Sequence, residues 1–583
     1  MKEKIITDFL DSNEIDNFPK KILELPVFDK KNILKKNIIY SKKWDDYNKK
    51  ITDIKKNLIL YDYFLKKLIV FLNSYHNKKY SKRYWSIILG PWLYWFISSI
   101  SFKWNLIKSL KKKNYVFFKK KINVKDIIPQ GIEDFQKIAV SNYWNHYIFT
   151  KIIEHSFSNK FLIKDGGKIN NNPERTQIYQ KLKNKSIKEK ISLFIQKILN
   201  FFSYKGNILI FSTYMSNYEE LKLNLLINKS LLYYKSLRPY LFYEKKNLFD
   251  FKRKKFKRLR SSKIGLKNFL SKELLNNLPS AHLENFKSVE NIVHKIPFPK
   301  SPKKIFTCLG ISRSTLMDRY IAKNIENGSS LILAQHGGNY FQHKLHFSSI
   351  YEVDISDKFL SWGNIKKKKI IPIGVIKNLS KPIKKSNKII LEVRMRKGYN
   401  REIKIDSGFH ESKKYFKNLC TFFSLIKGKK CSDNLFVKLH PTKSFWCEKQ
   451  QFLAHNPKLN FLDEKKKMVE EMSSAKLIIH TFCSTGHLEC LALNRPTLIL
   501  FVHNFNLLNE RSKNYLKKFM KLGIVHKTPE SLLKVLESFD TNKSIKKWWN
   551  LKKRQDLLIK YRNDFCFFNK NKISNLKDVI NEK

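Results

Sequence analysis

Short apolar runs alternate with helical patterns over the last two thirds of the chain. The segments between them, such as 314–327, 415–427 and 465–473, repeat apolar residues at helical spacing. Two series of runs occur, at 207–212, 304–308, 330–334 and 358–361, and then at 388–393, 434–439, 476–479 and 497–501. Buried strands that alternate with helices predict parallel α/β sheets. The polar, proline-containing segment 376–386 between the two series predicts an interdomain linker.

The predicted fold class is therefore α/β and GT-B-like, with two Rossmann-like domains facing a cleft. Residues 1–375 are expected to form an N-terminal, acceptor-side domain, with a large helical elaboration at about 50–200. Residues 387–530 are expected to form a nucleotide-donor-binding domain, followed by a basic helical segment, 531–583. Within the N-terminal part, the pattern also suggests a strand at 37–40 and a polar loop at 160–190.

The stretch 476–501 reads as one βαβ unit. An apolar run leads to Thr481, Ser484 and Thr485, after which a helical pattern begins. In parallel sheets ligands bind outside the carboxyl ends of strands, and a helix N-terminus offers free N–H groups to an anion. These hydroxyls are therefore expected to bind a phosphate, and Glu489, one turn into the helix, to accept ribose hydroxyls. The alternatives are a helix cap and a solvated glutamate, and the neighbouring His480 and His487 are assigned structural roles.

A histidine directly follows the apolar run 330–334. His336 is succeeded by Gly337 and Gly338, which allow close backbone approach. A histidine at the carboxyl end of a strand faces the ligand crevice, and its ordinary pKa suits proton abstraction from an acceptor hydroxyl. We expect His336 to be the catalytic base, the alternative being a loop histidine with only local hydrogen bonds.

An acidic cluster follows this loop in a strongly basic chain. It contains Glu352, Asp354 and Asp357. One of these carboxylates, with Asp354 and Asp357 as the candidates, is expected to orient His336 or to act as the base itself. A cap or a surface position is the alternative for each.

In the second series, the run 434–439 ends in a His-Pro pair. Lys438 and His440 are expected to neutralise a donor phosphate, and Pro441 to stiffen the turn. The sequence has no GxxxxGK[ST] or GxGxxG motif, no HExxH and no spaced Cys/His set. We therefore expect no tightly bound metal or cofactor.

The formal charge of +67, from 116 basic and 49 acidic residues, is typical of nucleic-acid or membrane-surface binding. The excess is mostly lysine spread along the whole chain, without a compact aromatic-basic motif, which argues against nucleic acid as a partner. Seven cysteines without a CxxC pair indicate reduced thiols in the cytoplasm. The N-terminus has acidic residues inside its short apolar stretch and does not resemble a signal peptide.

Residues 84–102 contain no charged residue and many aromatics, and Gly90-Pro91 interrupts them. The pattern favours a buried helix pair, with an interfacial anchor or a membrane span as alternatives.

Several short motifs carry a resemblance to a known family. They lie at 81–85, 89–93, 305–307, 335–340 (QHGGNY), 355–357, 361–363, 484–489 (STGHLE) and 494–497. With them the chain resembles a family of transferases encoded in bacterial surface-carbohydrate clusters. The His-Gly and His-Pro pair is more distantly similar to that of CDP-glycerol glycerophosphotransferases and capsule sialyl- and Kdo-transferases, which have GT-B-type folds and cytidine-activated donors. The resemblance implies His336 as a base and His440, Ser484 and Thr485 as donor-phosphate contacts.

These observations lead to one functional hypothesis. A glycosyl or glycerophosphoryl-type group is moved from a nucleotide-activated donor, CMP- or CDP-linked, to a glycan or lipid-linked precursor of a cell-surface glycan. The protein is expected in the cytoplasm or at the inner face of the membrane, with a peripheral membrane contact as one option. The alternatives are a UDP-sugar epimerase-like GT-B enzyme, a non-catalytic component of a glycan-assembly complex, and a nucleic-acid binder.

Overall fold

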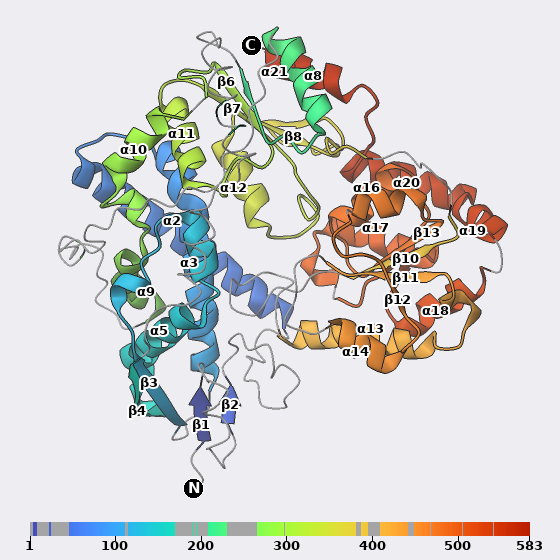
Figure 1. Ribbon diagram of the computed structural model, residues 1–583, viewed down its shortest axis with the longest axis horizontal. Helices are drawn as coiled ribbons and strands as arrows, with labels where there is room; N and C mark the ends of the chain where they lie inside the picture. The colour runs from blue at the N-terminus through green and yellow to red at the C-terminus, as the bar shows by residue number, and fades with distance from the viewer. Residues whose placement is uncertain are drawn as a thin grey trace.

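The computed structural model describes two large parallel sheets, each flanked by helices, a smaller third sheet, and a tall helical layer beside the first large sheet (Figure 1). The described residues are 46–110, 115–168, 208–229, 265–296, 298–379, 386–393, 409–440, 448–466, 468–503, 505–539 and 542–582, the strands β1 (Lys4–Thr7) and β2 (Ile22–Glu24), and the single residues 191, 194 and 253. The strand suggested at 37–40 and the middle of the linker, 380–385, lie outside them.

The C-terminal sheet has six strands in the order β12-β11-β10-β13-β14-β15, and every neighbouring pair is parallel. Its strands are β10 (Ile389–Glu392), β11 (Leu435–Lys438), β12 (Asn460–Phe461), β13 (Leu477–His480), β14 (Thr497–Leu500) and β15 (Val525–His526). In chain order this is 3-2-1-4-5-6, the doubly wound Rossmann order. The order reverses between β10 and β13, so their carboxyl ends border the expected ligand crevice.

The N-terminal domain contains a five-stranded parallel sheet in the order β5-β6-β7-β8-β9. Its strands are β5 (Leu209–Ile210), β6 (Lys304–Thr307), β7 (Ser330–Ala334), β8 (Lys358–Ser361) and β9 (Ile370–Pro372). The predicted GT-B-like α/β class with a helical elaboration is confirmed. Both predicted strand series are found, whereas β9, β12 and β15 escaped prediction because two or three residues leave no readable pattern.

The uncharged aromatic segment lies within one helix of the N-terminal layer, α3 (Lys82–Ser109). Among the described helices it alone has the length and apolar composition to cross a membrane, and 94% of its most apolar window is buried inside the protein. It packs against α2 (Tyr47–His76) and α11 (Thr315–Glu326). The predicted break at Gly90-Pro91 is wrong. The helix continues through Pro91, and Gly90 leaves room for Tyr351, whose ring a Cβ would meet at 2.6 Å.

A second departure from the sequence prediction concerns a small parallel sheet of order β2-β1-β3-β4, in a part of the chain expected to be mainly helical. Strand β3 covers Tyr115–Lys121 and β4 covers Phe161–Lys168. The start of the predicted loop 160–190 is therefore a strand. The rest of that loop lies outside the described residues. Lysines and two glycines in β4 hid its pairing with β3.

The chain returns to the N-terminal domain at its end. The second domain carries the helices α13 (Phe409–Leu425), α14 (Glu448–His455), α15 (Met468–Ser474), α16 (Thr485–Ala492), α17 (Glu510–Lys521), α18 (Pro529–Glu537), α19 (Asn542–Trp549) and α20 (Lys552–Phe565). The last helix, α21 (Lys572–Asn581), lies beside α8 (Asn217–Asn228) on the first sheet (Figure 1). Leu576 and Ile580 are buried there against Ile210 and Phe306. The two domains are thus connected by the linker and by the α20–α21 crossing.

Candidate active site

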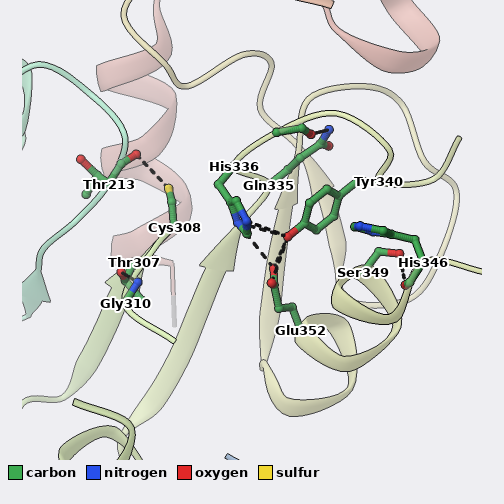
Figure 2. Close-up of polar contacts among 11 residues, drawn as sticks. Thr213, Thr307, Cys308, Gly310, Gln335, His336, Tyr340, His346, Ser349 and Glu352 are labelled. Carbon is green, nitrogen blue, oxygen red and sulfur yellow. Dashed lines mark hydrogen bonds and ion pairs between the residues drawn. The ribbon is translucent and has the colours of Figure 1, made fainter. Parts of the chain in front are cut away.

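The loop after β7 places a histidine at the carboxyl edge of the first sheet (Figure 2). Gln335 fixes the start of this loop, because its Nε2 donates to the carbonyl of Gly337 at 2.9 Å and its Oε1 accepts from the N–H of Trp362 at 3.0 Å. Asn339 and Phe341 have φ values of +74° and +57°. Such left-handed conformations in non-glycine residues are costly and concentrate at functional sites.

His336 belongs to a hydrogen-bonded chain of three side chains. The Tyr340 hydroxyl lies 3.1 Å from Nδ1 of His336 and donates to Glu352 at 2.8–2.9 Å (Figure 2). Glu352 comes from helix α12 (Phe347–Ile355), and its Oε2 is 3.9 Å from Nδ1 of His336. Tyr340 and Glu352 are buried, whereas the His336 side chain is 26% exposed. These hydrogen bonds therefore connect the partly exposed imidazole of His336 to the buried carboxyl group of Glu352.

Burial shifts the pKa values of His336 and Glu352 in opposite directions. Burial, with the positive charge of Arg313 as a smaller cause, lowers the pKa of His336 to about 4. Burial raises the pKa of Glu352 to about 8, although the hydrogen bond from Tyr340 and the charge of Arg313 oppose it. Since both shifts favour the neutral form, His336 can accept a proton at neutral pH, and Glu352 holds one.

The Glu352→Gln variant tests this assignment through stability. Because the pKa of Glu352 is raised from 4.5 to about 8, the folded protein holds a proton there that the unfolded chain releases above pH 4.5. The stabilisation is complete below pH 4.5 and declines until about pH 8. Glutamine does not titrate, so the unfolding midpoint of the variant relative to wild type is expected to rise by a few degrees from pH 5 to pH 9. Calorimetry or thermal fluorescence at both pH values measures this difference, and equal midpoint differences at both would contradict the buried, protonated Glu352.

The two aspartates predicted beside His336 lie elsewhere. Glu352 and Asp354 are two residues apart on one helix, so they point about 200° apart, and Asp354 is on the exposed side of α12. Asp357 is held by Arg83, whose two terminal nitrogens donate to its oxygens at 3.0 and 2.7 Å, and it also accepts the N–H of Leu331 at 2.7 Å. The expectation that one of them orients His336 is wrong in this geometry, and the carboxyl group in contact with the histidine chain is that of Glu352.

Asp357 and Asp354 give a matched pair of variants for this correction. Asp357→Ala removes the acceptor of Arg83 and of the Leu331 N–H, and is expected to lower the free energy of unfolding by about 1–2 kcal/mol, a modest figure because the pair is partly exposed. Asp354→Ala is expected to change it by less than about 0.5 kcal/mol. Urea unfolding measures both. A stability loss with Asp354→Ala that equals the loss with Asp357→Ala would contradict the assignment.

The second domain meets the histidine loop at the start of α16. Thr485 Oγ1 accepts a hydrogen bond from the N–H of Gly338 at 2.9 Å. A Cβ on Gly338 would lie 2.4 Å from the carbonyl carbon of Ser484 and 2.6 Å from the N of Thr485. Ser484 occupies the N-cap of α16, and its side chain makes no capping hydrogen bond. The predicted phosphate-binding turn and the loop of the predicted base are therefore in direct contact.

The other residues predicted to bind a donor differ in their hydrogen bonds and in their exposure. The Nζ of Lys438 donates to the carbonyls of Asp463 and Lys466, and the Thr481 hydroxyl donates to the carbonyl of Glu392 and bonds to the hydroxyl of Tyr415. The side chains of Lys438 and Thr481 therefore make structural hydrogen bonds within the protein. His440 is exposed after β11, and Pro441 lies outside the described residues. His487 is fully buried and bonds to Tyr561, in agreement with its structural assignment.

The comparison with protein families decides the class of this protein. The model of the LIC12162 family of transferases matches residues 26–580, nearly the whole chain. The chain belongs to this family. The predicted transferase class is thereby confirmed. No curated protein matches this transferase.

Several solved structures are similar to parts of this chain. They include MnaA of S. aureus with UDP (11% identity, 65% of this chain and 96% of that chain, TM-score 0.34) and MurG of Acinetobacter baumannii (11% identity, 65% and 100%, TM-score 0.32). A third is the UDP-GlcNAc 2-epimerase of Neisseria meningitidis bound to UDP-GlcNAc (12% identity, 61% and 100%, TM-score 0.33).

Two side-chain contacts of carboxylates in the transferase were not predicted from its sequence. Glu489 is buried, and its Oε1 lies 2.6 Å from the Nζ of Lys377, at the start of the linker. At the end of β10, Oε2 of Glu392 lies 2.5 Å from Nδ1 of His480 at the end of β13. Glu392 had a readable signal, since an acidic residue directly follows the apolar run of a strand. Lys377 had none in this lysine-rich chain. Among the described residues, no three His, Cys, Asp or Glu side chains converge as a metal site.

Proposed function

We propose that this transferase moves a glycosyl or glycerophosphoryl-type group from a nucleotide-activated donor to a precursor of a cell-surface glycan. One observation carries the proposal: the loop of His336 and the turn of Ser484 and Thr485 touch through the hydrogen bond from Gly338 to Thr485. His336, the proton acceptor of the N-terminal domain in this proposal, is two residues from Gly338, which contacts the N-terminus of α16 in the second domain. A helix N-terminus can bind an anion, so the two functions are held close together.

In this proposal His336 is the catalytic base. Its neutral imidazole takes the proton of the acceptor hydroxyl while the acceptor oxygen bonds to the transferred group. Tyr340 then accepts a hydrogen bond from Nδ1 of the imidazolium and donates its own hydrogen to Glu352.

The donor phosphate binds at the N-terminus of α16 in this proposal. The Ser484 hydroxyl, the Thr485 hydroxyl and the free N–H groups of the first helical turn stabilise the leaving group as its bond to the transferred group breaks. His440 is exposed beside this site and adds a cation when protonated. Glu489 binds ribose hydroxyls when it exchanges Lys377 for the donor. No tightly bound metal or cofactor is part of the proposal.

A cytidine-linked donor, CMP- or CDP-activated, is the form of the proposal that follows from the His-Gly and His-Pro resemblance. The acceptor is a glycan or lipid-linked precursor, reached in the cytoplasm or at the inner face of the membrane, with or without a peripheral membrane contact. A thermal-shift screen across cytidine, uridine and guanosine nucleotides tests the donor class, and a selective shift with CMP or CDP is expected.

Transfer itself is tested with purified protein, labelled CMP- and CDP-linked donors and a glycan precursor mixture. We expect label to enter the acceptor and free nucleotide to appear only when acceptor is present. Turnover of a UDP-sugar without any acceptor would overturn transfer in favour of epimerisation. Absence of binding of every nucleotide would overturn the proposal in favour of a non-catalytic role.

A further inference from the structure

Two side chains meet at the point where the strand order of the C-terminal sheet reverses. Strands β10 and β13 are parallel neighbours, and their last residues, Glu392 and His480, are directly paired in register. Both side chains therefore stand at the carboxyl edge of the sheet, at the topological switch point where α/β proteins bind ligands. The position alone marks them as candidates for ligand contact.

The two side chains form an ordered dyad. Glu392 Oε2 is 2.5 Å from Nδ1 of His480, and the His480 side chain is 1% exposed. This contact makes Nδ1 the bonded nitrogen, while the other ring nitrogen, Nε2, is buried and has no hydrogen-bond partner. An unpartnered buried polar atom is costly, and native proteins retain one where a ligand or water completes it.

The dyad lies beneath the first turn of α16. A Cβ on Gly486 would be 2.6 Å from Oε2 of Glu392 and 3.1 Å from Cε1 of His480, the ring atom between its two nitrogens. Glycine is thus the residue that lets the ring edge reach the helix terminus. The imidazole and the free N–H groups of α16 therefore border the same place.

Charge favours an anion as the missing partner of the imidazole. Glu392 accepts from Nδ1, and the hydrogen bond and charge of His480, with Lys377 and His440 as further causes, offset burial and hold its pKa below the ordinary value. With Nδ1 bonded to Glu392, Nε2 is the ring nitrogen left to donate a hydrogen to a ligand. A phosphate oxygen accepts such a hydrogen bond strongly.

We propose that His480, oriented by Glu392, binds a phosphate oxygen of the nucleotide donor through Nε2. This rests on the proposed function and assigns to His480 the phosphate contact that was expected of Lys438 and Thr481. As the bond between the donor phosphate and the transferred group breaks, the negative charge that develops on the departing phosphate is stabilised by the Nε2–H bond. The acceptor proton goes to His336, and His480 keeps its own.

Titration calorimetry with inorganic pyrophosphate, CDP, UDP and the matching nucleosides tests this role. His480→Asn keeps an amide at the position of Nδ1 for Glu392 and removes the ring edge that carries Nε2. It is expected to weaken binding of pyrophosphate and of the nucleotide that wild type binds by about 10- to 100-fold, with nucleoside binding unchanged. Glu392→Gln, which retains the size but not the charge, is expected to show a smaller loss of the same selectivity. His455→Asn, on α14 with a bond to Ser424, is the control and binds as wild type.

The outcomes separate this inference from the function on which it rests. Wild-type phosphate affinity in His480→Asn, or an equal loss of nucleoside and nucleotide, would overturn the phosphate contact. Pyrophosphate binding by wild type that His480→Asn loses, without binding of any nucleotide, would retain the phosphate contact and overturn the nucleotide donor. If His480→Asn does not fold, Glu392→Gln decides, because a wild-type affinity there overturns the dyad.

Discussion

Replacement of His336 by alanine is expected to lower kcat by about 100- to 10,000-fold, the contribution typical of a general base. The imidazole is the more exposed end of the hydrogen-bonded series through Tyr340 to Glu352, and its pKa of about 4 keeps it unprotonated at neutral pH. The donor KM is expected to change little, because the donor phosphate is bound by the other domain. Steady-state kinetics with the donor identified by the nucleotide screen measure both constants.

Two further variants complete this experiment. Tyr340→Phe removes the hydroxyl between His336 and Glu352 and is expected to reduce kcat by less than the histidine variant does. Asp354→Ala, on the exposed side of the same helix as Glu352, is expected to retain kcat. An unchanged kcat in His336→Ala would remove this residue from the mechanism. A loss of kcat in Asp354→Ala equal to that of the histidine variant would restore Asp354 as the carboxylate that orients His336 or acts as the base.

The strands were predictable where burial repeats a simple pattern. The runs at 330–334 and 358–361 match β7 and β8, because strands covered by helices on both faces are continuously apolar. The same logic failed for β4, where lysines and Gly166-Gly167 lie in a strand with an exposed face. It failed again at Gly90-Pro91, because tertiary packing of α3 overrides a local helix breaker.

The sequence predicts only those site residues that directly follow a recognisable strand. His336, Ser484 and Thr485 follow apolar runs, and the structure brings them to one place. The partner of His336 was not predictable, because the choice between Glu352 and Asp354 depends on which face of α12 meets the sheet. From the sequence, Lys438 was also expected to be free to bind a phosphate. In the structure its ammonium group donates hydrogen bonds to two backbone carbonyls on the neighbouring β12–α15 connection.

The second large effect is expected from Gly338→Ala. Neither Gly337 nor Gly338 has a positive φ, so alanine fits the backbone conformation of both, and only the surrounding atoms distinguish them. At Gly338 the new Cβ would meet the backbone of Ser484 and Thr485 at 2.4–2.7 Å. Backbone cannot rotate away as a side chain does, so the two loops must separate by about an ångström, and misplacement of this size costs on the order of 100-fold in kcat/KM.

Gly337→Ala is the matched control, since its Cβ meets only Oγ1 of Thr485, at 2.9 Å, a side-chain atom that needs a shift of only a few tenths of an ångström while the backbone of the turn stays in place. We expect a loss of kcat/KM for Gly337→Ala that is at least about tenfold smaller than for Gly338→Ala, while circular dichroism shows both variants folded. Small-angle scattering is expected to show a larger radius of gyration for Gly338→Ala than for Gly337→Ala in the absence of donor. Equal kinetics for the two variants would mean that the contact between Gly338 and Thr485 is not part of the catalytic arrangement. A selective loss in Gly338→Ala would support catalysis where the two sheets' carboxyl edges meet, because of the two glycines it is Gly338 that lies against the backbone of Ser484 and Thr485.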